Sequence, residues 1–206
     1  MEFDSSTIKT AIHVFSSILE TPAIIILIVA VIIVVAQLGS VIIEWFASRA
    51  GKHLNVTRVL TEIAGKNKAD TLAILQKRDF QKTQKKAYAM LLGSNIHSVE
   101  DQKIFAVQLL ADEETRLDGR VAVTDIISRI APMFGLMATL IPLGPGLIAL
   151  GQGDTKTLSD SLLTAFDATV AGLASAGVAY IISKVRKRWY QSDLTTMETI
   201  LEGVIK

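Results

Sequence analysis

The chain has 206 residues, of which half are hydrophobic, and its formal net charge is +1. Its mean hydropathy of +0.43 is higher than is usual for a soluble domain of this length, because the surface of such a domain must be polar. The sequence has no cysteine and only three scattered histidines, which excludes disulfides and thiolate metal sites, so we expect no cofactor and no metal.

Charged residues are segregated from three long apolar runs. No charge occurs in residues 21–43 or 130–153, and residues 161–183 contain only Asp167. A helix needs about 20 residues to cross the hydrocarbon core, so each run is long enough to span a bilayer. The alternating segments of about ten residues that a membrane β-barrel needs do not occur. We therefore expect an all-α integral membrane protein with three transmembrane helices.

The expected segments follow in chain order. They are an outer amphipathic N-terminal helix over residues 1–20, transmembrane helix 1 over 21–47, a long cytoplasmic helical insert over 48–129, transmembrane helix 2 over 130–153, an outer turn over 154–160, transmembrane helix 3 over 161–183 and a cytoplasmic C-terminal tail over 184–206. The first helix is expected from an apolar stripe between Ile8 and Leu19, which would equally suit a simple lead-in to the first span. A capping-box pattern at Ser98 and Asp101 opens a helix that we expect to continue into the second span.

Basic residues indicate the orientation. All of the 21 Lys and Arg residues except Lys9 and Lys156 lie in residues 48–129 or after residue 183. Basic residues near helix ends stay on the cytoplasmic side, so the N-terminus is expected outside and the insert and C-tail inside. The same residues could bind anionic lipid or nucleic acid, but a role in topology is favoured, and we expect no nucleic-acid partner.

Nothing in the sequence indicates an enzyme. Neither a glycine-rich phosphate loop nor a Ser-His-Asp set occurs. The acidic run from Asp112 to Glu114 has basic neighbours and is typical of a solvated helix face rather than of a metal site.

Small residues recur on one face of both C-terminal runs. The faces comprise Gly135, Thr139, Pro142, Gly146, Ala149 and Gly153 in the second run, and Ala168, Gly172, Ser175 and Ala179 in the third. Small faces allow helices to approach closely in lipid, so Gly135, Gly146, Ala168 and Gly172 are expected to pack helices together. Pro142 and Pro145 lack backbone donors and are expected to kink the second span.

Among the polar side chains of these runs, Thr139, Thr169 and Asp167 lie well inside. A membrane threonine often bonds a carbonyl of its own helix, yet Thr139 and Thr169 on adjacent small-faced helices favour a shared polar lining. A carboxylate at a helix centre costs roughly 2.5–3.5 kcal/mol, less near an interface. Asp167 lies roughly opposite Thr169 around its helix, so either residue could face a water-filled path while the other faces a neighbour. A plain interface-level aspartate is the alternative for Asp167.

These residues carry a resemblance to the MotA/TolQ/ExbB proton channel family. The matching segments are Gly-Leu-Met-Ala-Thr at 135–139, Ala-Phe-Asp-Ala-Thr-Val-Ala-Gly-Leu at 165–173 and the turn Gly-Gln-Gly-Asp at 151–154. The resemblance covers roughly residues 127–190. Three spans favour the ExbB/TolQ-like branch over the four-span MotA branch.

The resemblance implies a stator subunit in the cell (inner) membrane. Five copies would form a ring around two single-span helices of the ExbD, TolR or MotB type. The ring would couple ion flow, expected to be of protons, to motion of that partner. Thr139 and Thr169 match the threonines that line the path in this family. Thr164 stands where many members have a glutamate, and Asp167 offers a carboxylate three residues later.

Other functions remain open on the sequence alone. A non-conducting membrane scaffold that recruits cytoplasmic proteins is the main alternative. A transporter component is less favoured because the chain has neither an inverted repeat nor a nucleotide motif. A membrane enzyme ranks last.

Overall fold

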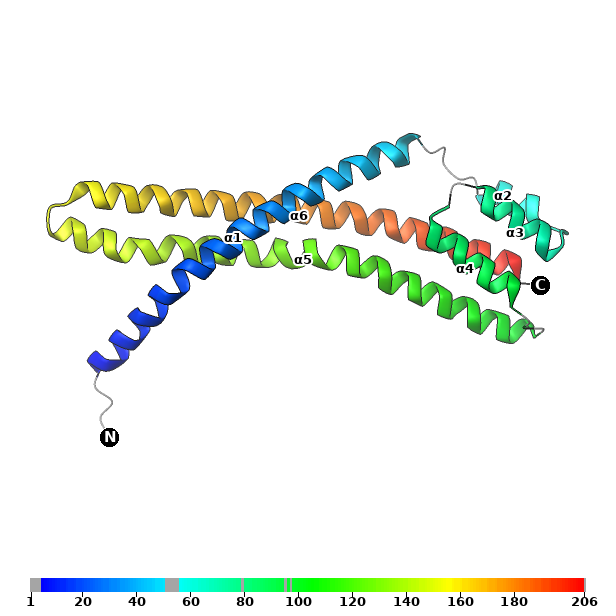
Figure 1. Cartoon of the computed structure of the whole chain (residues 1–206), viewed down its shortest axis with the longest axis horizontal. Helices are drawn as coiled ribbons and strands as arrows, with labels where there is room; N and C mark the ends of the chain where they lie inside the picture. Colours follow the sequence, from blue (N-terminus) through cyan, green and yellow to red (C-terminus); the bar gives the residue numbers. More distant parts are fainter. Residues whose placement is uncertain (1–4, 51–55, 79, 95, 97, 206) are drawn as a thin grey trace. The chain divides into compact units, whose positions relative to one another are not determined.

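The fold was taken from a computed structural model, which describes residues 5–50, 56–78, 80–94, 96 and 98–205. The regular elements of this part are all α-helices, which confirms the expected all-α class. They are α1 (Ser5–Ala50), α2 (Val56–Ile63), α3 (Lys68–Lys77), α4 (Lys82–Gly93), α5 (Val99–Gly151) and α6 (Thr155–Val204) (Figure 1).

Three of these helices, α1, α5 and α6, are long and apolar enough to cross a membrane. This confirms the expectation of three membrane-length helices. The helix expected to open near Ser98 and to continue into the second span is the single helix α5, whose 53 residues include Pro132, Pro142 and Pro145.

Two expected boundaries differ from the structure. Helix α1 continues through Pro22, so no break separates the expected outer helix from the first span. Proline has a helical φ and can remain inside a helix at the loss of one hydrogen bond. Helix α6 begins at Thr155, which makes residues 155–160 helical rather than part of the outer turn. Asp154 explains this early start, because its Oδ1 accepts hydrogen bonds from the backbone N–H of Lys156 (3.1 Å) and of Thr157 (3.0 Å).

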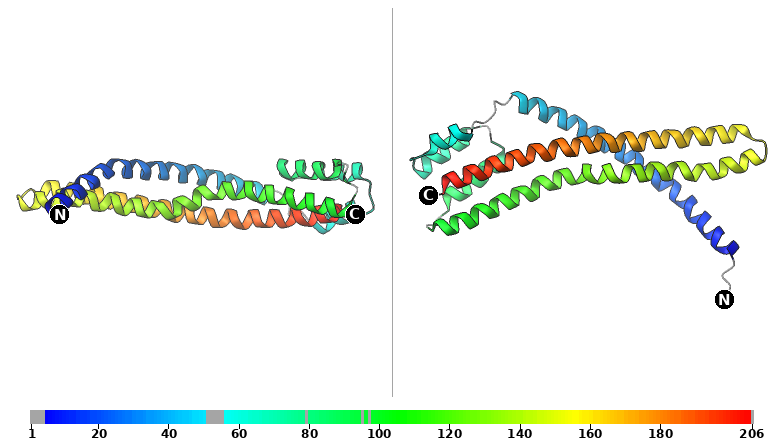
Figure 2. Two further views of the ribbon diagram at one scale, coloured as in Figure 1. Left: turned by 90° about the horizontal axis from the view of Figure 1, so that it is seen from below. Right: turned by 180° about the vertical axis from the view of Figure 1, so that it is seen from behind.

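The chain divides into two compact units. The apolar unit comprises Met1–Val41 and Val123–Ser183, and the polar unit comprises Ile42–Ala122 and Lys184–Lys206. Helices α5 and α6 contribute to both units, where they lie side by side and antiparallel after the turn at residues 152–154 (Figures 1 and 2).

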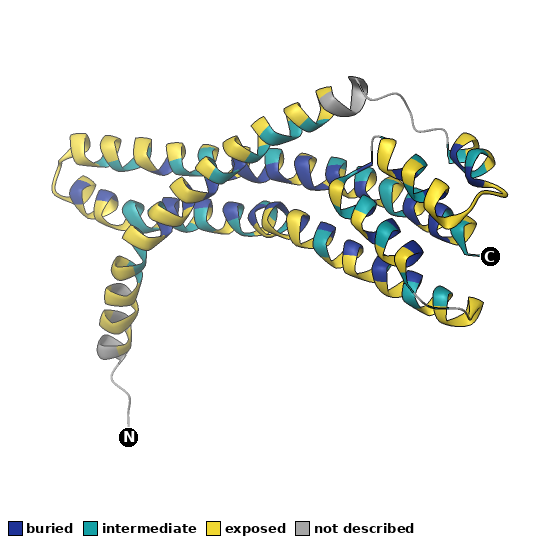
Figure 3. Ribbon diagram, turned by 45° about the vertical axis from the view of Figure 1, so that its right-hand side comes forward, coloured by how far each residue is buried: buried dark blue, intermediate teal, exposed yellow. Residues whose placement is uncertain are grey.

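In the apolar unit, α1 packs against the α5–α6 pair along one narrow stripe. Ala30 and Val34 share a buried cluster with Ile127 and Ala131 of α5 and with Ala176 and Ala179 of α6. Outside this stripe, exposed residues occur along all three helices (Figure 3), and many of them are large and apolar. Such a surface suits lipid or other helices rather than water.

In the polar unit, the short helices cover the ends of α5 and α6. Their shared core consists of Val59, Ile63, Leu75, Phe80, Ala87, Tyr88, Leu91, Leu92, Ala106, Leu109, Met197, Ile200 and Leu201. The rings of Phe80 and Tyr88 meet edge to face with centroids 5.3 Å apart. The apolar side chains of this core come from α2, α3, α4, α5 and α6, so the short helices and the ends of α5 and α6 share one packed interior.

Candidate functional site

Helices α5 and α6 approach each other closely at a pair of glycines. A Cβ atom placed on Gly172 would lie 2.9 Å from Cα of Gly135 and 2.9 Å from the carbonyl oxygen of Ala131. A Cβ on Gly135 would lie 3.3 Å from the carbonyl oxygen of Ala168. The two backbones therefore touch here, as small residues permit in membrane helices.

A second close contact lies nearer the turn, where a Cβ on Gly146 would come 3.0 Å from Cβ of Ser161. The structure thus places all four expected packing residues, Gly135, Gly146, Ala168 and Gly172, in one interface. These contacts also fix the antiparallel register, because Gly135 faces Gly172 and Gly146 faces Ser161.

This register brings the two threonines to one level of the helix pair. Thr139 comes opposite Ala168, and Thr169 comes opposite Ala138. Thr139 is 9% exposed, and Thr169 is half-buried. The Thr139 hydroxyl donates to the Leu136 carbonyl (2.6 Å), and the Thr169 hydroxyl donates to the Ala165 carbonyl (3.3 Å). Each hydroxyl proton is used within its own helix, so the oxygen lone pairs are what these residues offer to a neighbour.

The other two expected pathway residues lie on a different face of α6. Thr164 and Asp167 are both exposed, and the Thr164 hydroxyl donates to the carbonyl of Asp160 (3.0 Å). Phe166 and Val170, on either side of Asp167, are exposed as well. Within one chain, therefore, the structure does not bring Asp167 into the packed interface that holds the threonines.

A polar contact joins α5 to α6 near the charged end of the apolar unit. It was not predicted from the sequence. The Ser183 hydroxyl of α6 donates to Oδ1 of Asp125 of α5 (3.3 Å), and Arg129 pairs with Oδ2 of the same carboxylate (2.9 Å). The spacing of Asp125 and Arg129 at i and i+4 was a visible signal. The contact with Ser183, 58 residues away, was not.

The polar unit contains a buried charged network, also missed in the sequence. The Arg116 guanidinium forms two bonds to the Glu113 carboxylate (2.8 and 2.5 Å), and the Thr83 hydroxyl donates to the same group (3.0 Å). Gln81 joins this pair to α6, since its Oε1 accepts from Arg116 (3.2 Å) and its Nε2 donates to Asp193 (3.0 Å). The network thereby ties the start of α4 to both long helices.

The two carboxyls of this network have opposite pKa shifts. Burial opposes ionisation of Glu113, but the bonds from Arg116 and Thr83 outweigh it and hold the pKa below its ordinary value. Among the described residues, the hydrogen-bond donor to Asp193 is the neutral amide of Gln81. Burial, aided by the Glu113 charge, therefore raises the pKa of Asp193.

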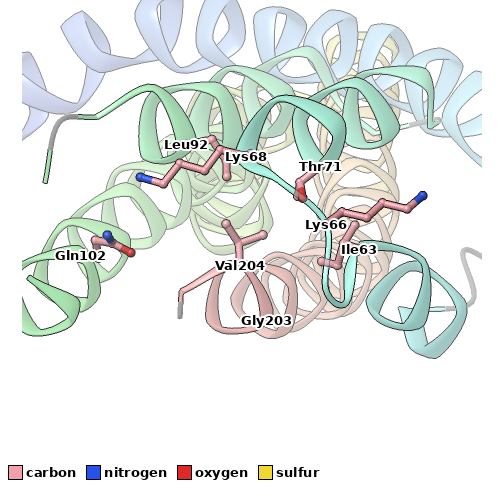
Figure 4. A pocket seen from close by; sticks show the side chains of 8 residues that line it. All are labelled: Ile63, Lys66, Lys68, Thr71, Leu92, Gln102, Gly203 and Val204. Atoms are coloured by element: carbon pink, nitrogen blue, oxygen red, sulfur yellow. The ribbon is translucent and has the colours of Figure 1, made fainter. Parts of the chain in front are cut away.

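A small pocket lies in the polar unit, between α2, α3, α4 and the ends of α5 and α6 (Figure 4). Its volume is about 90 Å³, and aliphatic side chains and the stems of Lys66 and Lys68 form much of its wall. The two lysine ammonium groups point away from each other, so they do not converge on one ligand. Within the described residues, no group of three His, Cys, Asp or Glu side chains could hold a metal ion.

Comparison with known proteins places these features in a family. No match was found among curated proteins. A model of one protein family, however, matches residues 76–199, a range that includes the two threonines, Asp167 and the buried charged network. That family consists of membrane ion channels rather than enzymes. The chain is therefore a multi-pass membrane protein and belongs to the MotA/TolQ/ExbB proton channel family.

Proposed function

We propose that the protein is a proton-conducting subunit of the three-span ExbB/TolQ-like branch, and that it drives motion of a single-span partner. The main support is the position of Thr139 and Thr169, which lie at the same level of two tightly packed apolar helices. A chain that only needed an anchor would gain nothing from two oxygen acceptors at one depth of its helix pair.

Asp167 supports an assembly of several copies. Its side chain is exposed on an apolar stretch of α6. In lipid this carboxylate would cost roughly 2.5–3.5 kcal/mol at mid-depth. A ring of five chains around two partner helices removes this cost, because the exposed face of α6 then borders a water-filled lumen.

The charge distribution supports an orientation with the polar unit in the cytoplasm. Lys184, Arg186, Lys187 and Arg188 follow the third span directly, and Arg129 precedes the second. Such clusters hold helix ends on the cytoplasmic side of the cell membrane and leave the N-terminus outside.

The test removes one hydroxyl at a time. Thr139→Val and Thr169→Val keep nearly the same shape and are expected to abolish partner-dependent proton uptake, measured in vesicles holding the chain and its co-purified single-span subunit. The matched control is Thr115→Val in the polar unit, whose hydroxyl also donates to its own helix, at 2.9 Å from the Ala111 carbonyl. Native mass spectrometry should show five copies of the chain in the wild type and in all three variants.

Each other outcome has a defined meaning. Wild-type uptake in both Thr139→Val and Thr169→Val would refute the proposed lining. No uptake by the wild type in the presence of its partner would favour the non-conducting scaffold. Asp167→Asn tests the charge alone, and uptake equal to that of the wild type would remove Asp167 from the pathway.

A further inference from the structure

We propose that Pro142 leaves the carbonyl oxygen of Ala138 as a fixed acceptor for a water molecule or a hydrated proton at the level of Thr139 and Thr169. This inference deepens the proposed function and rests on it for its role in conduction. It concerns a backbone atom, whereas the expected lining consisted of side chains.

Pro142 removes the usual hydrogen-bond donor of the Ala138 carbonyl. In an α-helix the carbonyl of residue 138 accepts from the N–H of residue 142, and proline has no N–H. Helix α5 nevertheless continues through Pro142. Ala138 is 2% exposed, so its carbonyl lies inside the protein rather than at its surface. The hydroxyl of the next residue, Thr139, does not replace the missing donor, because it donates to the Leu136 carbonyl.

Helix geometry sets the direction in which the Ala138 carbonyl points. Helix carbonyls point along the axis toward the residue four positions later. Pro142 belongs to the same helix face as Gly135 and Gly146, which both touch α6. The freed oxygen of Ala138 therefore lies on the packed face of α5, and the register places Thr169 opposite it.

The Ala138 carbonyl and the two threonine hydroxyls place three oxygen atoms at this level. The hydroxyl protons of Thr139 and Thr169 are already bonded within their own helices. Together with the Ala138 carbonyl they form a group that can accept hydrogen bonds but has no proton left to donate. A buried acceptor needs a partner, and the partner must bring its own protons. Water and the hydronium ion both do so, and a carbonyl acceptor stays unprotonated whatever the pH.

Pro145 supplies a matched control. It lies three residues further along the same helix and removes the donor of the Ile141 carbonyl. Pro145 is exposed, and it lies about 4.5 Å further along the helix axis than Pro142, nearer the turn at residues 152–154. Replacing Pro145 therefore restores a helical hydrogen bond without touching the threonine level.

The sequence permits a direct measurement of water at this carbonyl. Alanine is followed by threonine only at Ala138–Thr139 and Ala168–Thr169. Labelling with carbonyl-¹³C alanine and ¹⁵N threonine therefore selects two carbonyls in the full-length chain in lipid bilayers. The Ala168 carbonyl has Gly172 N–H as its helical donor and packs against Gly135, so it serves as the dry internal reference.

In water-edited solid-state NMR, magnetisation from water should reach the Ala138 carbonyl faster than the Ala168 carbonyl. In Pro142→Ala the two carbonyls should behave alike, because residue 142 again has an N–H. In Pro145→Ala the wild-type difference should persist. An Ala138 carbonyl as slow as Ala168 in the wild type, or unchanged in Pro142→Ala, would overturn the inference.

Proton uptake then separates this inference from the proposed function. Pro142→Ala is expected to lower partner-dependent uptake by about tenfold or more, which is the effect of losing one hydrogen bond to a charged group. This loss is expected even though alanine makes the helix more regular than proline does. Pro145→Ala should leave it unchanged. A wild type that does not conduct refutes the proposed function while the NMR result stands. A conducting wild type whose Pro142→Ala variant conducts equally refutes the role of the carbonyl.

Discussion

Replacement of Gly172 by alanine should weaken the pairing of α5 with α6. The added Cβ would lie 2.9 Å from Cα of Gly135 and 2.9 Å from the carbonyl oxygen of Ala131. Both neighbours are backbone atoms, so no rotamer change can make room. The two helices must move apart, which reduces contact along the whole small-residue interface.

The magnitude follows from two opposing terms. Overpacking of a tight site costs about 1–3 kcal/mol. Alanine is favoured over glycine inside a helix by about 1 kcal/mol. Gly172→Ala should therefore change the free energy of unfolding by about 0–2 kcal/mol in the destabilising direction. Gly177, five residues later in α6, has no atom within 4 Å of the position that a Cβ would take, so Gly177→Ala gains only the helix term.

The difference between the two variants isolates the packing term, because the helix term cancels. Gly177→Ala should exceed Gly172→Ala in unfolding free energy by about 1–3 kcal/mol. Reversible unfolding of the full-length protein in mixed detergent and SDS micelles, followed by circular dichroism, measures this difference. Gly119→Ala, equally open around its Cβ, gives a second reference outside the apolar unit. Identical transitions for Gly172→Ala and Gly177→Ala would refute the backbone contact.

Three further substitutions test the buried charged network and its surroundings by thermal unfolding at different pH values. The pKa of Glu113 is lowered in the folded state, so ionised Glu113 stabilises the fold above the unfolded pKa of about 4.3. This stabilisation is lost as the pH falls through the folded pKa. Glu113→Gln should remove this loss of stability at acid pH. The raised pKa of Asp193 has the opposite sign: stability is lost as the pH rises from about 3.9 through the folded pKa, and Asp193→Asn should abolish that decline. An unchanged pH profile in either variant would contradict the assignment. Tyr88→Phe should leave the unfolding free energy unchanged or raise it by about 1 kcal/mol, because the buried hydroxyl has no partner among the described residues; a clear loss would reveal one.

Much of the fold follows from local features of the sequence. Three uncharged or nearly uncharged runs of more than 20 residues can only be helices if they are to bury their backbone groups in lipid. Small residues at helical spacing define the packed faces by their periodicity, and the segments at 135–139 and 165–173 suffice to identify the family. These features depend on neighbours within a few turns of one helix, which is why sequence reasoning reaches them.

Contacts between distant residues depended on the tertiary structure. The bond from Ser183 to Asp125 and the bridge from Gln81 to Asp193 join residues 58 and 112 positions apart. No local pattern encodes such pairs, because they depend on how two helices are aligned. The unbroken passage of α1 through Pro22 was likewise not visible in the sequence, since proline is compatible both with a helix start and with a helix interior.

Thr139 and Thr169 show most clearly where prediction from the sequence ends and where the three-dimensional fold is needed. Helical periodicity is a local property, and it suffices to place Thr139 and Thr169 inside membrane-length helices, on or beside faces of small residues. Periodicity carries no information about whether the two threonines lie at the same depth. Their common depth comes from the register of α5 on α6, which the contact of Gly172 with Gly135 fixes, since backbones can meet this closely only where neither residue has a side chain.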